Sequence, residues 1–172
     1  FPPEIHPEGR FTCGTSLLFP NIAPYGENSG VIIFSTLHHI PLGSFTHTNY
    51  IEAFQNASAF VSAASSNRPD CRFVAVTQNV LPSSGGALVH PHMQVNVDSI
   101  PMNYHQLLMN SNSRDGQGDL LLELAVAEKD VGVRWIASFG DWSVFTAFAP
   151  LAAEEVHAVH TGARRLTDLN SR

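Results

Sequence analysis

One amphipathic helical pattern, set among short runs typical of β-strands, constrains the fold of this chain more than any other feature. Phe54, Ala57 and Val61 recur at spacings of three and four residues, which places them on one face of a helix. The pattern extends over residues 48–65, and the Asn-Arg-Pro-Asp sequence at 67–70 ends it. We therefore expect one main helix with an apolar face that packs on another element.

The remaining apolar runs are short and bounded by turn residues. The ranges that fit β-strands are 11–19, 31–35, 72–78, 87–97, 133–138, 143–149 and, with a less regular alternation, 154–160. The run at 120–126 fits either a helix or a strand. Because a loop rich in Pro, Ser and Gly separates 72–78 from 87–97, these two runs predict an antiparallel hairpin. Together the patterns predict an α+β fold in which one main helix packs on an antiparallel sheet.

The length of 172 residues fits one domain, or one domain and part of a second. A polar run of Asn, Ser, Arg, Asp, Gln and Gly predicts a linker or mobile loop at 111–118. It would separate a domain at 1–110 from residues 119–172. The latter would supply either the remaining strands of the same domain or the start of a second half.

The composition excludes several classes of protein. Hydrophobic residues make up 44% and charged residues 14%, which is unlike a disordered chain. The net charge of −6, with no basic stripe, argues against a nucleic-acid partner. No apolar run approaches the roughly 20 residues of a membrane span. The two cysteines, Cys13 and Cys71, cannot build a disulfide framework, so we expect a reducing, cytoplasmic setting.

The most informative polar residues are His90, His92 and Gln94, which lie in the predicted strand at 87–97. Alternate residues of a strand share a face, so these three side chains are expected to project together. By chance a chain with nine histidines holds about 0.5 His-x-His pairs, but only about 0.01 with Gln two residues further on. The alternative is a histidine pair on an exposed strand face.

The loop before these residues has the composition of an anion site. Gly85 and Gly86 can adopt backbone angles that let N–H groups approach an anion closely. The hydroxyl groups of Ser83 and Ser84 lie beside them in the sequence. A phosphate group is therefore the ligand that we expect at this loop.

At these residues the chain resembles the galactose-1-phosphate uridylyltransferases, a branch of the histidine-triad superfamily. The segments that carry the resemblance are Asn79 with His-Pro-His-Met-Gln at 90–94, Leu-Phe-Pro-Asn at 18–21, the run 31–38, and the stretches 142–150 and 155–156. Residues 90–94 are the most specific of them. The resemblance implies a histidine-triad-like antiparallel sheet with the site on the strand that carries His92.

The resemblance also implies a role for each matched residue. His92 would be the nucleophile that takes a nucleotidyl group, and Gln94 would donate to the phosphoryl oxygens. Asn21 would contact the ribose and Asn79 a phosphate or sugar. The chemistry of imidazole agrees, because its unperturbed pKa of about 6.5 leaves a neutral nucleophile near pH 7 that forms a labile phosphoramidate.

The function that follows is transfer of a nucleoside monophosphate from a nucleoside diphosphate hexose to a hexose 1-phosphate. Two alternatives stay open at this point. One is a related nucleotide phosphorylase or hydrolase, in which phosphate or water is the acceptor. The other is a metal- or nucleotide-binding module without turnover. A homodimer would be unsurprising, because an exposed sheet edge can pair with a second copy.

The resemblance implies a structural zinc ion held in part by His38 and His90. In the family a pair of cysteines completes this site, and that pair is absent from this sequence. Cys13 lies in the predicted strand before Asn21 rather than where the pair belongs. The two histidines are then either a vestigial pair or two ligands of a site that residues outside this chain complete.

Overall fold

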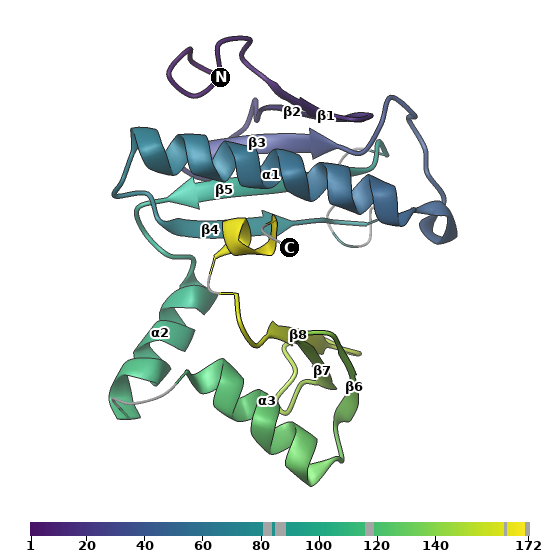
Figure 1. Cartoon of the computed structure of the whole chain (residues 1–172), viewed down its shortest axis with the longest axis vertical. Coiled ribbons are helices and arrows are strands. Elements are labelled where there is room, and N and C mark those ends of the chain that lie inside the picture. The colour runs from purple at the N-terminus through teal and green to yellow at the C-terminus, as the bar shows by residue number, and fades with distance from the viewer. Residues whose placement is uncertain (81–83, 85–88, 116–118, 164, 171–172) are drawn as a thin grey trace. The chain divides into compact units, whose positions relative to one another are not determined.

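The computed structural model describes residues 1–80, 84, 89–115, 119–163 and 165–170 (Figure 1). The chain divides into two compact units, the first made of Phe1–Pro101 with Leu166–Arg172 and the second of Met102–Arg165. The elements of the first unit are β1 (Phe11–Cys13), β2 (Ser16–Pro20), β3 (Asn28–Ile33), η1 (Leu42–Ser44), α1 (His47–Asn67), β4 (Phe73–Thr77), β5 (His92–Asp98) and η3 (Leu166–Asn170). Those of the second are α2 (Asn103–Asp115), α3 (Leu120–Val131), β6 (Trp135–Phe139), β7 (Trp142–Thr146) and β8 (Val156–His160).

The first unit is a five-stranded antiparallel sheet with α1 lying across one face (Figure 1). Its strand order is β1-β2-β3-β5-β4, and every neighbouring pair is antiparallel. The predicted α+β fold, with one main helix packed on an antiparallel sheet, is confirmed. The predicted hairpin is also present, because β4 pairs directly with β5.

Helix α1 confirms the predicted helix at 48–65 and extends it by a residue or two at each end. The helix begins after Thr46, whose hydroxyl accepts the Asn49 N–H while the Asn49 side chain accepts the Thr46 N–H. This reciprocal cap satisfies two donors that a helix start leaves unpaired. The N–H of Arg68 then closes the last turn on the carbonyl of Ala64.

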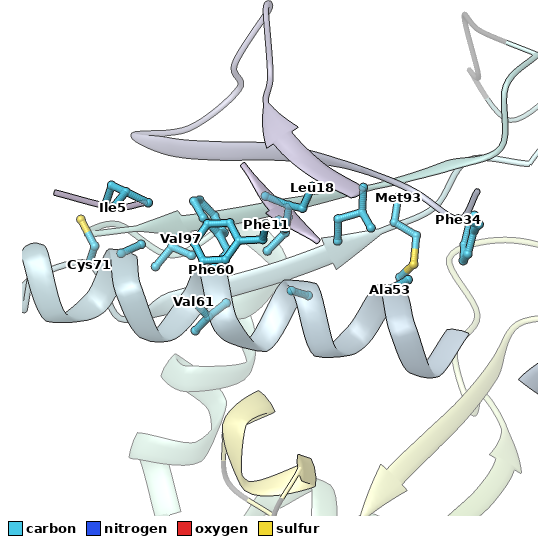
Figure 2. Close-up of a cluster of buried hydrophobic side chains, with 14 residues drawn as sticks. Ile5, Phe11, Leu18, Phe34, Ala53, Phe60, Val61, Cys71, Met93 and Val97 are labelled. Carbon is cyan, nitrogen blue, oxygen red and sulfur yellow. The ribbon is translucent and has the colours of Figure 1, made fainter. Parts of the chain in front are cut away.

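The core lies between α1 and the sheet (Figure 2). Phe60 and Ala57 of α1 are fully buried, and from the strands Leu18, Ile32 and Val95 have no exposed surface. Burying apolar area on this scale is the main source of stability, at about 25 cal/mol for each Å² removed from water. The packing fixes which residues of each strand face the helix.

The predicted single strand at 11–19 is wrong, because the structure divides it into β1 and β2. The chain reverses at Gly14, which has a φ of +54°, a conformation that glycine adopts without steric cost. A Cβ atom at Gly14 would also overlap the carboxylate of Glu52. The two halves then pair as a hairpin, with Cys13 opposite Ser16.

The predicted strand at 87–97 is too long at its start, because β5 begins only at His92. Val89 and His90 lie in a bend, and residues 87–88 lie outside the described residues. The physical reason is Pro91, which has no N–H to donate to a sheet ladder. His90 is therefore not a strand residue.

The second unit is a three-stranded antiparallel sheet, β6-β7-β8, with α3 in contact with all three strands. The segment at 120–126, ambiguous from sequence, is helical: Asp119 caps α3 by accepting the N–H groups of Leu121 and Leu122. The sequence of 111–115, expected within a linker, is the end of α2, and 116–118 lie outside the described residues. Strands β6, β7 and β8 thus form a sheet of their own, while η3 belongs to the first unit.

In the part of the chain that the structure describes, none of the helices is both long enough and apolar enough to span a membrane.

Candidate active site on the open face of the sheet

Strand β5 has two chemically different faces. Met93 and Val97 point into the core beneath α1 (Figure 2). Because successive strand residues alternate, His92, Gln94 and Asn96 lie on the opposite face. We call the side of the five-stranded sheet away from α1 the open face. His92 and Gln94 are partly exposed there, as the sequence predicted for these two side chains.

Neighbouring strands set the surroundings of these polar residues. Ile33 of β3 is the cross-strand partner of His92. Gln94 lies between Val31 of β3 and Thr77 of β4. The open face therefore presents a line of polar side chains along β5, flanked mainly by apolar or small ones.

The imidazole of His92 is held by the main chain. Its Nδ1 atom lies 2.8 Å from the carbonyl oxygen of His90. A carbonyl oxygen can only accept, so Nδ1 carries the proton and donates this hydrogen bond. In the neutral ring Nε2 then keeps its lone pair, and the ring orientation is fixed. This is the arrangement that a nucleophilic imidazole requires.

His90 itself projects toward a different partner. Its ring meets that of His38 edge to face, with ring centroids 5.2 Å apart and planes at 89°. His38 lies in the exposed loop after β3. The structure thus brings together the two histidines that the sequence predicted as metal ligands. The predicted alignment of His90 with His92 and Gln94 on one strand face is not formed, because His90 precedes β5.

The described residues do not complete a zinc site at this histidine pair. Two imidazoles supply half of the four ligands of a structural zinc ion. The described His, Cys, Asp and Glu groups that come close enough in threes to share a cation are Glu27, Asp70 and Cys71, and neither histidine belongs to that group. The thiol of Cys13 donates to Gln55 of α1 instead. The described residues therefore supply two of the four ligands of such a site, and the zinc ion stays a prediction.

Asn21 follows β2 and reaches the neighbouring strand β3. Its N–H donates to the Ser29 carbonyl, and its amide Nδ2 to the Ser29 hydroxyl at 3.3 Å. Ser29 is the cross-strand partner of Asn96 on the open face. Asn21 thus borders the sheet that carries His92, but at the level of Asn96, four positions further along β5.

The other predicted contacts lie around the loop between β4 and β5. Asn79 is exposed and follows β4 by two residues. The hydroxyl of Ser84 donates to the carbonyl of Val80 at 2.6 Å. Ser83, Gly85 and Gly86 lie outside the described residues, so the predicted anion loop stays a prediction.

Sequence reasoning missed two residues of the open face, Asn96 and Ser29. Both residues are buried, and each has 8% of its surface exposed to solvent. The Oδ1 atom of Asn96 has no hydrogen-bond partner among the described residues. The signal was present in the sequence, because the alternation that joins His92 to Gln94 continues to Asn96.

A charged cluster fixes the end of β5 beyond Asn96. The Glu27 carboxylate accepts the hydroxyl and the N–H of Ser99 and pairs with Arg68 at 2.9 Å. The Ser99 hydroxyl is the main cause that lowers the pKa of Glu27. Arg68 also pairs with Asp70 and lowers the pKa of that carboxyl. Burial raises the pKa of the adjacent Cys71 thiol.

Comparison with known proteins bears on the fold. No protein-family model matches the sequence. An uncharacterized protein of Archaeoglobus fulgidus is 29% identical over 151 residues, which cover 86% of this chain and 44% of that protein. Two solved structures, of a uridylyltransferase and of a uridylyltransferase mutant, match with TM-scores of 0.69 and 0.66 at 16% identity.

The chain has a uridylyltransferase-like fold. Each of the two structural matches covers 90% of this chain, and 57% and 58% of the solved chains. The chain therefore spans about half the length of the proteins that it matches.

Proposed function

We propose that this chain carries the nucleophile of a nucleotidyltransferase, which moves a nucleoside monophosphate from a nucleoside diphosphate hexose to a hexose 1-phosphate. The observation that carries the proposal is the hydrogen bond from His92 Nδ1 to the His90 carbonyl. In the neutral ring this bond places the lone pair on Nε2, and the ring is partly exposed on a sheet whose fold matches that of uridylyltransferases.

The first half-reaction forms a covalent intermediate. The lone pair of His92 Nε2 attacks the α-phosphorus of the donor, and an N–P bond forms. The bond from that phosphorus to the bridging oxygen breaks, and hexose 1-phosphate leaves with its electron pair. The imidazole becomes cationic, and the His90 carbonyl stabilises the charge through the Nδ1–H bond.

The second half-reaction restores the enzyme. A phosphate oxygen of the acceptor hexose 1-phosphate attacks the same phosphorus and forms a P–O bond. The N–P bond breaks, and its electron pair returns to Nε2. The step needs no proton transfer to His92. This agrees with the hydrogen bond of the other ring nitrogen, Nδ1, to the His90 carbonyl.

Gln94 would act on the phosphoryl oxygens. It lies two residues after His92 on the same face of β5, so the two side chains are about 7 Å apart at their Cα atoms. The amide NH₂ can donate to an equatorial oxygen whose charge grows during transfer. Phosphoryl transfer depends largely on positioning and charge stabilisation of this kind. In this proposal Asn79, Ser83, Ser84, Gly85 and Gly86 supply further contacts to the phosphates or sugar.

A chase experiment tests the proposal. The protein is incubated with nucleoside diphosphate hexoses labelled with ³²P in the α-phosphate, freed of excess donor, and mixed with galactose 1-phosphate, inorganic phosphate or buffer. Transfer of the label to a new nucleoside diphosphate hexose supports the proposal. Release only as nucleoside diphosphate or monophosphate would replace it with a phosphorylase or a hydrolase, respectively. Binding without any transfer would indicate a non-catalytic module.

A further inference from the structure

Asn96 is a buried polar side chain with an unused acceptor. Its side chain lies on the open face of β5, in line with His92 and Gln94, and only 8% of the residue is exposed. Its Oδ1 has no hydrogen-bond partner among the described residues. Leaving a buried carbonyl unpaired is costly, so such groups in folded proteins call for an explanation.

Asn96 has small residues beside it on the two neighbouring strands, and one of them carries a hydroxyl group. Its cross-strand partners are Ser29 of β3 and Ala75 of β4, which both have short side chains. The Ser29 hydroxyl oxygen accepts a hydrogen bond from the Asn21 amide. Among the contacts of the described residues, the Ser29 O–H itself is not used as a donor. An acceptor and a donor thus lie on adjacent strands of one face.

The position along β5 indicates which part of a nucleotide would reach this pair. Asn96 is four positions after His92, which corresponds to about 13 Å of strand. In the proposed reaction the α-phosphorus lies at His92 and its oxygens lie near Gln94. Asn96 is further along the same line, where the end of the nucleotide opposite the phosphate would lie.

We propose that Asn96, with Ser29, binds the base of the nucleotide, the Asn96 carbonyl accepting a hydrogen bond from a ring N–H or an exocyclic amino group. The inference rests on the proposed function, because it takes His92 as the phosphate end. The terminal torsion of an Asn side chain is broad, so the amide can turn its carbonyl toward the base when the nucleotide binds. The base then provides the partner that Oδ1 lacks.

Binding measurements separate the base from the rest of the nucleotide. We would measure the dissociation constants of UMP, CMP, AMP, GMP and ribose 5-phosphate for the whole chain and for Asn96→Leu, which keeps a similar volume. The variant should bind the preferred nucleotide about tenfold more weakly, the loss of one hydrogen bond. Ribose 5-phosphate, which has no base, should bind both proteins equally. The matched control is Asn67→Leu at the exposed end of α1, which should change neither constant.

A structural role predicts a different result. The carbonyl that Asn96→Leu removes has no partner among the described residues, so the melting temperature without ligand should stay the same or rise. A fall of more than about 5 °C, or equal weakening of ribose 5-phosphate and the nucleotides, would overturn the inference. So would unchanged nucleotide binding, or no nucleotide binding by the unmodified chain. If Asn96→Leu does not fold, Asn96→Ser takes its place. The weakening of its nucleotide binding is then compared with that of its ribose 5-phosphate binding in the same way.

The same measurements distinguish this inference from the proposed function. They are repeated in a His92→Asn background, which cannot form the covalent intermediate but keeps the open face. A base-dependent effect of Asn96→Leu that persists there, with no covalent label on the unmodified chain, would support the base site and contradict the transferase. A label on His92 with no effect of Asn96→Leu would do the reverse.

Discussion

The amide of Asn56 donates a hydrogen bond to the hydroxyl of Ser16 at 3.0 Å, in the interior between α1 and β2. Ser16 passes the contact on, because its hydroxyl donates to the carbonyl of Ile33 at 2.9 Å. Ile33 is the cross-strand partner of His92. A buried polar chain thus ties the main helix to the strand end beside the candidate nucleophile.

Replacing Asn56 with Ala should destabilise the first unit by about 1–3 kcal/mol, because it leaves a cavity and removes a buried donor. Both tryptophans, Trp135 and Trp142, belong to the second unit, so their fluorescence reports on unfolding of that unit and not of the first. Hydrogen exchange of the α1 amides is the appropriate measurement. The control Ser62→Ala, at an exposed position of the same helix, should change the free energy of unfolding by less than about 0.5 kcal/mol. An equal effect of the two variants would contradict this reading.

Acid should weaken the first unit through Glu27 and Asp70. The pKa of each carboxyl is lowered in the folded state, by the Ser99 hydroxyl for Glu27 and by Arg68 for Asp70. The unfolded chain therefore binds more protons, so the stabilisation is complete above the ordinary pKa of about 4.5 for Glu27 and is lost as the pH falls through the lowered value. The melting temperature should therefore begin to fall only below about pH 4.5.

Ser99→Ala isolates the contribution of Glu27. It should lower the melting temperature near pH 7, and the difference from the unmodified chain should close at acid pH, where the carboxyl is protonated in both. Ser62→Ala is the matched control, with no such convergence. A Ser99→Ala difference that stays constant from pH 7 to pH 3 would show that Ser99 does not act through the charge of Glu27.

The sequence predicted the parts of the fold that repeat a pattern over many residues. Helix α1 shows the helical period over five turns, and its boundaries came out within two residues. The polar end of α2 had no apolar period to reveal it, so it resembled a linker. The division of 11–19 into two strands depended on a single residue, Gly14, whose left-handed backbone a strand pattern does not show.

The positions of site residues were predictable where strand alternation sets them. A contact made by a main-chain atom was not predictable. His92 and Gln94 are on one face as predicted. His90 is not, because Pro91 ends the ladder before it is reached. The role of the His90 carbonyl, which orients His92, has no signature in the identity of the side chain. The proposed role of Asn96 could not be predicted, because it rests on the burial of the side chain, which the sequence does not show.

Gln94→Ala should slow nucleotidylation of the protein by about 10²–10³, the range for removal of one preorganised donor in acyl transfer. The side chain is partly exposed, so the fold should tolerate the change. Single-turnover labelling at saturating donor measures the rate directly. Gln106→Ala on α2 is the matched control and should leave the rate unchanged. A rate within twofold for Gln94→Ala would remove Gln94 from the reaction.

His90→Asn should reduce labelling far less than His92→Asn. The atom of His90 that holds His92 is the main-chain carbonyl, which the substitution keeps. The variant loses the ring contact with His38, so a small effect on stability is expected. Labelling rates of the two variants are compared at one donor concentration. Equal loss in both would mean that the His90 side chain takes part in the chemistry.

The central claim is a covalent nucleotide on His92, and the stability of the label tests it most directly. The protein is incubated with α-³²P-labelled UDP-, ADP- and GDP-sugars and then exposed to acid or base. A phosphoramidate on imidazole is lost in acid and survives in base, whereas a serine phosphate ester survives in acid. We predict an acid-labile, base-stable label that is absent in His92→Asn and present in the exposed control His47→Asn. An acid-stable label, a label that persists in His92→Asn, or no label from any donor would contradict it.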